Sequence, residues 1–168
     1  DHLITFLNVV RRMGAEYQVL PEGILFWKTK KLLPINLTTT SHPGFMTDWQ
    51  QPFLALFTQI DGTSTIHETI YEDRFGYVSD LITLGADITT STECPTGSEC
   101  RFKGNNFTHV ASVRGATPLH GGVVTVRDLR AGIVNILAAL IASGTSEIHG
   151  VEEIDRGYDA IDLRLQQL

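Results

Sequence analysis

The sequence GTSTIH at Gly62–His67 occurs again, with a single change, as GTSEIH at Gly144–His149. The two copies begin 82 residues apart, since 144 minus 62 is 82. An Asp-Arg pair follows each copy at the same distance, as Asp73-Arg74 and then as Asp155-Arg156. Self-similarity at a fixed spacing is the signature of a repeat architecture. The chain is therefore predicted to fold from copies of one structural unit.

Two further elements recur around these copies. Asp48 and Asp128, which lie 80 residues apart, each open an apolar stretch ahead of a copy. The sequence Met13-Gly14-Ala15 is matched by Leu84-Gly85-Ala86, 71 residues later. Four elements with coinciding spacings indicate a real internal repeat rather than a chance match.

One unit is predicted to contain strand, helix, strand, helix, strand and strand, in that order. Asp48 and Asp128 are good helix N-caps, and apolar residues at helical spacing follow each of them. The expected first helices are 49–59 and 129–143, and the expected strands after them are 64–69 and 146–151. A second helix should begin near Arg74 or Gly157. Hairpin strands are expected at 16–19 with 24–28, and at 87–92 with 110–114, the second hairpin carrying an insertion at 93–106.

The predicted fold class is therefore α/β, built from βαβαββ units in one domain that spans residues 1–168. The units fall at roughly 1–37, 38–118 and 119–168, so the set of repeats is incomplete. Residue 1 falls at the start of a second-type helix, and the chain stops where the next Gly-Ala sequence should appear. We expect the chain to be a piece of a longer protein.

Composition excludes several classes of protein. The net charge is −6 and no Lys/Arg-rich block appears, so broad nucleic-acid binding lacks its electrostatic basis. The longest apolar run, 133–142, is about half a membrane span, and no secretory signal precedes it. These features predict a cytoplasmic protein with no membrane partner.

The two cysteines, Cys94 and Cys100, stand six residues apart in the predicted insertion. This spacing leaves open a local disulfide or a metal site. No second Cys/His pair at metal-ligand spacing follows, and a cytosolic context favours reduced thiols, so two free thiols and no metal site are expected.

Four motifs carry a resemblance to a known family. They are PGFMTD at 43–48, ETIYEDRF at 68–75, DLRAG at 128–132 and DRGY at 155–158. In this order they resemble the C-terminal half of the UDP-N-acetylglucosamine enolpyruvyl transferases of peptidoglycan synthesis. The shikimate-pathway enolpyruvyl transferases share the repeat, but their motifs match less closely. The resemblance implies an inside-out α/β prism, with helices inside and sheets outside, that forms one lobe of a two-lobed enzyme.

The resemblance also implies roles for individual residues. Asp48 resembles the carboxylate that faces the acceptor hydroxyl as general base or orienter. Arg130 and Arg156 resemble the arginines that hold phosphoenolpyruvate, and Asp128 a second carboxylate near the reacting centre. A guanidinium suits this task because its planar fork binds carboxylate and phosphate in a bidentate manner and stays charged.

Substrate binding is expected from a second group of residues. Arg74 resembles an arginine that assists binding, and the backbone at Ile70 and Tyr71 resembles the segment that holds the UDP-sugar. The partners implied are UDP-N-acetylglucosamine, phosphoenolpyruvate and a missing N-terminal lobe that carries the general acid. The reaction needs no metal and no organic cofactor. The chain alone is therefore expected to be inactive.

The residues also allow less specific interpretations. Asp48 and Asp128 are compatible with simple helix capping, and an Asp-Arg dipeptide with a solvated surface pair. His67 and His149 are expected to be packing or surface residues. At the level of function, two alternatives stay open: a non-catalytic homologue that binds sugar nucleotides, and a shikimate-pathway enolpyruvyl transferase.

Overall fold

The computed structural model describes residues 2–27, 31–95, 97 and 100–167. Asp1, Leu168 and Lys28, on which predictions about the chain ends and a hairpin strand rested, lie outside the described residues. The helices are α1 (Ile4–Arg12), η1 (Thr47–Trp49, a 3-10 helix), α2 (Gln50–Phe57), α3 (Val78–Thr83), α4 (Gly132–Ile141), α5 (Val151–Asp155) and α6 (Ile161–Leu165).

The central sheet has the strand order β3-β4-β6-β5, formed by β3 (Asn36–Thr38), β4 (Gly62–His67), β5 (Ile88–Ser91) and β6 (Val110–Gly115). β3 and β4 are parallel, and the chain passes between them through η1 and α2. β4 and β5 both pair antiparallel with β6. Thr, Ile and Val dominate these strands, as expected for residues that pack on a pleated surface. The predicted order of strand and helix in this unit is confirmed.

The other strands form two small sheets. β1 (Glu16–Leu20) and β2 (Gly23–Trp27) make an antiparallel hairpin. β7 (Val123–Thr125) and β8 (Glu147–His149) pair in parallel, with α4 between them in the chain. The β7-α4-β8 arrangement repeats β3-α2-β4, as the matching GTSTIH and GTSEIH sequences predict. We propose from this recurrence that the units divide near residues 37 and 118.

The predicted second helix is correct in kind but shifted in position. In the central unit it is α3, which begins at Val78 rather than near Arg74 and is followed by Leu84-Gly85-Ala86. In the last unit two short helices, α5 and α6, take its place. The residues between Arg74 and Val78 form turns, which keep Arg74 outside the regular helix.

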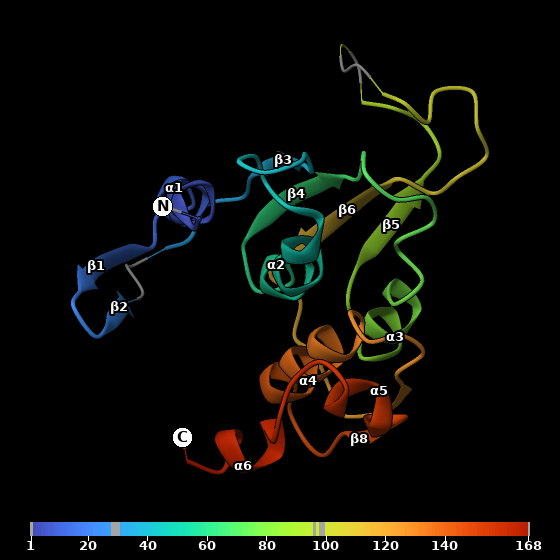
Figure 1. Cartoon of the computed structure of the whole chain (residues 1–168). Helices are drawn as coiled ribbons and strands as arrows, with labels where there is room; N and C mark the ends of the chain where they lie inside the picture. The colour runs from blue at the N-terminus through green and yellow to red at the C-terminus, as the bar shows by residue number, and fades with distance from the viewer. Residues whose placement is uncertain (1, 28–30, 96, 98–99, 168) are drawn as a thin grey trace.

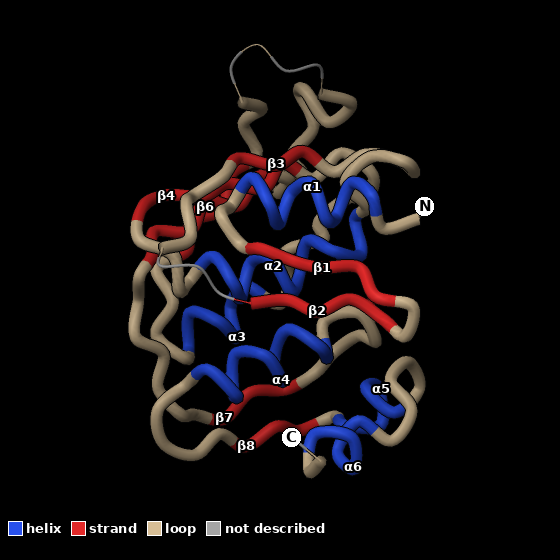
Figure 2. Tube along the Cα trace, turned by 90° about the vertical axis from the view of Figure 1, so that its left-hand side faces the viewer, coloured by secondary structure: helices blue, strands red, loops and turns tan. Residues whose placement is uncertain are grey.

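The helices α2, α3 and α4 lie between the sheets. Figure 2 shows them between β3, β4 and β6 on one side and the β7-β8 pair on the other, with the β1-β2 hairpin alongside. A single hydrophobic cluster joins these layers, with Phe53, Leu54 and Phe57 of α2 and Val134 of α4 almost fully buried. The parts of the chain that the structure describes form no closed barrel.

The loop between β5 and β6 contains the predicted insertion. Figure 1 shows this loop extending past the end of the sheet, and its described residues include no helix or strand from Thr92 to His109. Phe102 anchors the loop, since it is buried and its ring centroid lies 5.6 Å from that of His109. Among the described residues, no helix has the length and apolar character needed to cross a membrane.

Candidate functional site

Asp48 joins three segments that are distant in sequence. It lies in η1, and its Oδ1 is 2.8 Å from Nη2 of Arg74 and 3.2 Å from Nε of Arg130. Neither η1 nor α2 has a side-chain hydrogen bond at its N-cap. The expectation that Asp48 caps a helix is therefore wrong, because both arginines reach its carboxylate and the 3-10 turn already carries the chain into α2.

Arg74 is held firmly in this group. Its side chain is 9% exposed, although it carries a full charge. The guanidinium lies over the ring of Tyr71, 4.8 Å from the ring centroid, while its Nη2 contacts Asp48. A cation over an aromatic face is stabilised by the ring quadrupole, more so when water is excluded. The expectation of a solvated surface pair at Asp73-Arg74 is therefore wrong for Arg74.

Asp128 positions Arg130. Its Oδ1 accepts hydrogen bonds from the backbone N–H of Arg130 at 2.7 Å and of Ala131 at 3.3 Å. These amides belong to the turn before α4, whose N-cap position is Ala131 and carries no side-chain hydrogen bond. Asp128 therefore closes this turn and is not the N-cap of α4, which begins at Gly132 and not at Leu129 as expected. The turn fixes the backbone from which the half-exposed side chain of Arg130 reaches Asp48.

The DRGY segment packs against the same turn. A Cβ placed on Gly157 would lie 2.8 Å from Cδ1 of Leu129, so a larger residue there requires the leucine side chain or the backbone to shift. Burial raises the pKa of Tyr158, and the negative charge of Asp48 raises it further, which places the phenol within electrostatic reach of that carboxylate. The sequence predicts no role for Tyr158.

Arg156 is not among the described residues that contact Asp48. Its Nη1 pairs with Oε2 of Glu153, 2.8 Å away on the preceding turn, and its side chain is well exposed. The structure thus brings Arg74 to Asp48 but leaves Arg156 outside this group, and its expected role stays a prediction. An exposed arginine with a single surface partner is free to reorient, because such pairs contribute little energy.

The segment at Ile70 and Tyr71 is organised by Glu68, which sequence reasoning missed. Glu68 is fully buried, and its Oε1 accepts the backbone N–H of Ile70 at 2.7 Å and of Tyr71 at 3.2 Å. Three side chains donate to the same carboxylate: Thr39 at 2.9 Å, Thr47 at 2.8 Å and Gln50 at 2.5 Å. The sequence does contain a signal for this role, since Glu68 directly follows a predicted strand. Acidic residues are rarely buried in a fold unless they are hydrogen-bonded.

Glu68 thereby connects the two halves of the candidate site. Thr47 is the neighbour of Asp48 in η1, and Tyr71 is the residue under Arg74. The buried Tyr77 extends the network by donating to Oε1 of Gln50 at 2.7 Å. Burial, with a smaller contribution from the charge of Glu68, raises the pKa of Tyr77 well above its ordinary value.

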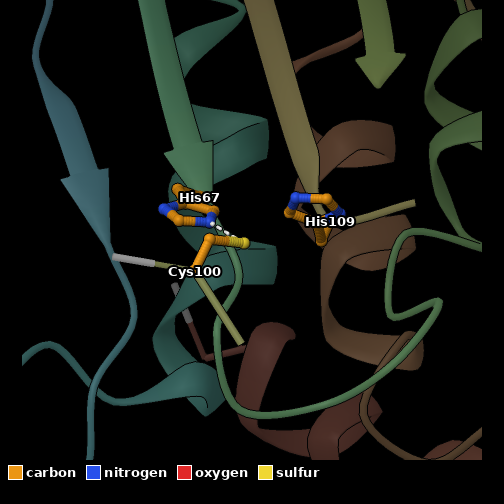
Figure 3. Close-up of side chains that lie close together, drawn as sticks. All are labelled: His67, Cys100 and His109. Carbon is orange, nitrogen blue, oxygen red and sulfur yellow. Dashed lines mark hydrogen bonds between the residues drawn. The ribbon is translucent and has the colours of Figure 1, made fainter. Parts of the chain in front are cut away.

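A second group of polar residues lies beside the insertion loop, at the end of β4. His67, Cys100 and His109 have ligand-type atoms that all lie within 4.8 Å of one another (Figure 3). Cys94 is not part of this set of atoms, but its Sγ lies 3.4 Å from Nε2 of His109. Both cysteines are free thiols, as expected. The sequence alone does not predict this group, because His67 is distant from the cysteines in sequence and meets His109 only through the pairing of the sheet.

The apolar cavity at the C-terminal end of the chain lies apart from Asp48. It has a volume of about 480 Å³ and is lined by residues of α4, β8, α5 and α6. None of Asp48, Arg74 and Arg130 lines it. The cavity is therefore separate from the charged group around Asp48.

Residues 2–165 match the family model described as EPSP synthase (3-phosphoshikimate 1-carboxyvinyltransferase). A UDP-N-acetylglucosamine 1-carboxyvinyltransferase of Protochlamydia amoebophila is 50% identical over 159 residues, which cover 94% of this chain and 34% of the relative. An enzyme of the same name from Chlamydia trachomatis serovar D is 42% identical, over 100% of this chain and 38% of the relative. The chain thus spans about a third of the length of these relatives.

Solved structures agree with these sequence matches. The enolpyruvyl transferase NikO from Streptomyces tendae superposes with a TM-score of 0.83 at 27% identity, covering 99% of this chain and 35% of that one. An EPSP synthase of Acinetobacter baumannii has a TM-score of 0.57 at 14% identity, over 86% of this chain and 31% of that one, which indicates a shared fold alone. The resemblance to UDP-N-acetylglucosamine enolpyruvyl transferases inferred from the motifs is confirmed.

Proposed function

The chain belongs to the EPSP synthase (3-phosphoshikimate 1-carboxyvinyltransferase) family, and from that premise we propose that it carries part of the active site of an enolpyruvyl transferase. The proposed reaction moves the enolpyruvyl group of phosphoenolpyruvate to the 3-hydroxyl of UDP-N-acetylglucosamine, with release of phosphate. This step would serve peptidoglycan synthesis in the cytoplasm.

The choice of acceptor rests on the degree of similarity. Relatives at 42–50% identity over nearly the whole chain are named for UDP-N-acetylglucosamine. The EPSP synthase structure matches at 14% identity and so speaks only for the fold. We therefore favour the UDP-sugar over shikimate 3-phosphate. The inside-out prism of that family is part of this proposal, and the position of α2, α3 and α4 between the sheets supports it (Figure 2).

One observation carries the proposal: the exposed carboxylate of Asp48 stands between two guanidinium groups, at 2.8 Å and 3.2 Å. Asp128 and Glu68 add two more carboxylates to this group, so its attraction for an anion rests on the half-exposed guanidinium of Arg130 and not on net charge. The contact of Oδ1 of Asp48 with this guanidinium supports the proposal that a carboxylate or phosphate oxygen binds there.

The two arginines would then have different tasks. The side chain of Arg74 is 9% exposed and is fixed by Tyr71, so it sets the position of Asp48. The side chain of Arg130 is 55% exposed and its ion pair with Asp48 is solvent-exposed, so it is free to turn towards phosphoenolpyruvate. Arg156 pairs only with Glu153 among the described residues. If its side chain turns away from Glu153, it would supply a second contact to phosphoenolpyruvate.

The proposed chemistry proceeds by addition and elimination. In the addition, the acceptor hydroxyl gives its proton to Asp48 as its oxygen bonds to C2 of phosphoenolpyruvate, and C3 gains a proton. In the elimination, the bond from C2 to the phosphate oxygen breaks and C3 loses a proton, which restores the vinyl group. Arginine contacts that strengthen as negative charge moves onto the leaving phosphate would lower the barrier to elimination.

The general acid that protonates C3 is assigned to no residue of this chain. We propose that it is supplied by a second lobe, consistent with the chain spanning about a third of its relatives. The 168-residue chain alone is then expected to bind anions weakly and to release no phosphate above background. Turnover by the chain alone would contradict the proposed division of the site.

The test is phosphate release by the protein expressed from its complete reading frame, with phosphoenolpyruvate and one acceptor at a time. Release with UDP-N-acetylglucosamine, and none with shikimate 3-phosphate, is the expected result. Release with shikimate 3-phosphate would move the protein to the other branch of the family. If neither acceptor supports release while UDP-N-acetylglucosamine still binds, the non-catalytic alternative replaces the proposal.

A further inference from the structure

Two buried histidines meet at one end of the central sheet. His67 is the last residue of β4, and His109 immediately precedes the neighbouring antiparallel strand β6. The backbone N–H of Glu68 donates to the carbonyl of His109 at 2.7 Å, which continues the pairing past the strand ends. The histidine rings therefore lie side by side, with centroids 5.5 Å apart, and both side chains are buried.

The insertion loop brings two thiols to these rings. Sγ of Cys100 lies 3.3 Å from Nε2 of His67, and Sγ of Cys94 lies 3.4 Å from Nε2 of His109 (Figure 3 shows the first of these contacts). The Cys94 thiol is also within hydrogen-bonding reach of Cys100. In a tetrahedral zinc site, bonds of about 2.3 Å to sulfur and 2.0–2.1 Å to nitrogen place these atoms about 3.5 Å apart. The two contacts from sulfur to nitrogen fit that edge length, whereas Cys94 lies outside the set of atoms within 4.8 Å of one another, so its side chain would move inward on binding.

His109 is already oriented as a metal ligand would be. Its Nδ1 lies 2.7 Å from the carbonyl oxygen of Phe107, so this nitrogen carries the proton and donates it. Nε2 is then left with a free lone pair that faces the thiol of Cys94. A hydrogen bond from the remote ring nitrogen to a backbone carbonyl is the usual support of a metal-bound histidine.

His67 lacks such support from the protein. Its Nδ1 is buried with no hydrogen-bond partner within the described part of the chain, and its Nε2 faces the sulfur of Cys100. A metal bond at Nε2 would leave the proton on Nδ1 and give that atom no acceptor, so the unpaired Nδ1 is no evidence for an ion. What marks His67 as a ligand is the contact of its Nε2 with Sγ of Cys100.

We propose that Cys94, Cys100, His67 and His109 bind one zinc ion in a closed, structural site. Two thiolates and two imidazoles are a ligand set that favours zinc among the divalent ions, and four protein ligands leave no position open for a substrate. The spacing is a histidine, then a Cys-x5-Cys pair, then a second histidine nine positions after Cys100, since 109 minus 100 is 9. This spacing differs from that of zinc-finger motifs, in which a local turn places the ligands. Here the two histidines lie at the ends of neighbouring strands.

The ion would fix the insertion loop on the sheet. The described part of this loop has no regular secondary structure between Thr92 and His109. Next to Cys100, Arg101 donates to the carbonyl of Ile70 at 3.1 Å and pairs with Glu72 at 3.3 Å. Zinc bound to Cys100 would therefore hold Arg101 against this segment. The metal site thus acts on the stability of the loop and does not depend on the enolpyruvyl transfer proposed above.

The experiment uses the complete protein, prepared metal-free in a thiol-free reductant and titrated with Zn²⁺. We expect one zinc per chain by mass spectrometry of the metal content. We also expect a rise in Tm of about 5–10 °C when zinc exceeds its dissociation constant about a hundredfold. Co²⁺ in place of Zn²⁺ should give the visible absorption of a tetrahedral site with thiolate ligands. Absence of zinc binding, or an unchanged Tm, would overturn the proposal.

The variants Cys94→Ser and Cys100→Ser separate this site from adventitious binding. Both positions are on the loop, so the fold should survive these substitutions. Loss of an outer-shell partner of a metal ligand lowers metal affinity by about 10–100-fold. Loss of a ligand itself should lower zinc affinity by more than that. His149→Ala is the matched control, since His149 occupies the place of His67 in the other repeat and its side chain is exposed. Zinc binding that persists in the double cysteine variant would refute the site. A metal-free protein isolated with a Cys94–Cys100 disulfide would refute it in favour of a redox pair.

Discussion

The guanidinium of Arg74 and the carboxylate of Asp48 form an ion pair of 2.8 Å in which the arginine side chain is 9% exposed and the aspartate side chain 65%. The cation is thus fixed from behind by the ring of Tyr71, while the anion faces solvent. This asymmetry leaves the carboxylate accessible to a substrate hydroxyl and keeps its position constant.

Arg130→Lys should weaken phosphoenolpyruvate binding without unfolding the protein. The lysine ammonium keeps the charge but loses the planar fork that binds carboxylate and phosphate in a bidentate manner. Because the side chain is half-exposed, the free energy of unfolding should change by less than about 0.5 kcal/mol. We expect KM for phosphoenolpyruvate to rise about tenfold in steady-state assays. An unchanged KM would show that Arg130 does not contact this substrate.

Glu68→Gln should destabilise the fold and loosen the segment at Ile70 and Tyr71. The substitution removes the charge that five donors share, and the new amide N–H₂ would face donors rather than acceptors. The expected loss is about 2–4 kcal/mol, measured by urea unfolding. Glu72→Gln is the control, because that carboxylate is exposed and pairs only weakly with Arg101. Equal effects of the two substitutions would contradict the assignment of Glu68.

Gly157→Ala should disturb the contact between the DRGY segment and the turn before α4. The added Cβ would stand 2.8 Å from Cδ1 of Leu129, so one of the two segments must move. We expect a destabilisation of about 1–3 kcal/mol, visible as a lower Tm. Gly76→Ala is the matched control, since a Cβ there meets nothing within 4 Å. A Gly157→Ala protein as stable as this control would show that the packing is looser than described.

Tyr77 should make the fold less stable in alkaline solution. Burial raises the pKa of its phenol well above the ordinary value, so the unfolded chain loses this proton at a lower pH than the folded chain does. Stability from this group is therefore complete below about pH 10 and falls as the pH rises above it. In denaturant unfolding at several pH values, Tyr77→Phe should reduce this alkaline loss, whereas Tyr17→Phe in the β1-β2 hairpin should not.

The repeat made much of the fold predictable. The matching sequences at Gly62–His67 and Gly144–His149 placed the strands β4 and β8, and the helices α2 and α4 before them, within a few residues. The bounds of β3 and β7 and their parallel pairing come from the structure. Helix α3 begins later than expected because the residues after Arg74 form turns, and turn boundaries leave little trace in apolar periodicity. The third copy differs in having α5 and α6, which the repeat alone does not encode.

The site was harder to predict, because its contacts are tertiary. The motifs singled out Asp48, Arg74 and Arg130 from resemblance, but local sequence suggested that Asp48 was a helix cap. Only the structure shows that Arg130, which belongs to another repeat, contacts the carboxylate of Asp48. Likewise His109 stands 42 residues from His67, since 109 minus 67 is 42, and no short-range pattern links them. Strand pairing brings them together.

The most direct test of the account is the rate of phosphate release by Asp48→Ala in the complete protein, with phosphoenolpyruvate and UDP-N-acetylglucosamine. The control is Asp61→Ala, which removes an equally exposed carboxylate from a surface pair with Lys31. We predict that kcat falls about 10²–10⁴-fold in Asp48→Ala, the usual contribution of a positioned general base, while Asp61→Ala retains full activity. A kcat for Asp48→Ala within about twofold of the Asp61→Ala value would contradict the central role given to Asp48.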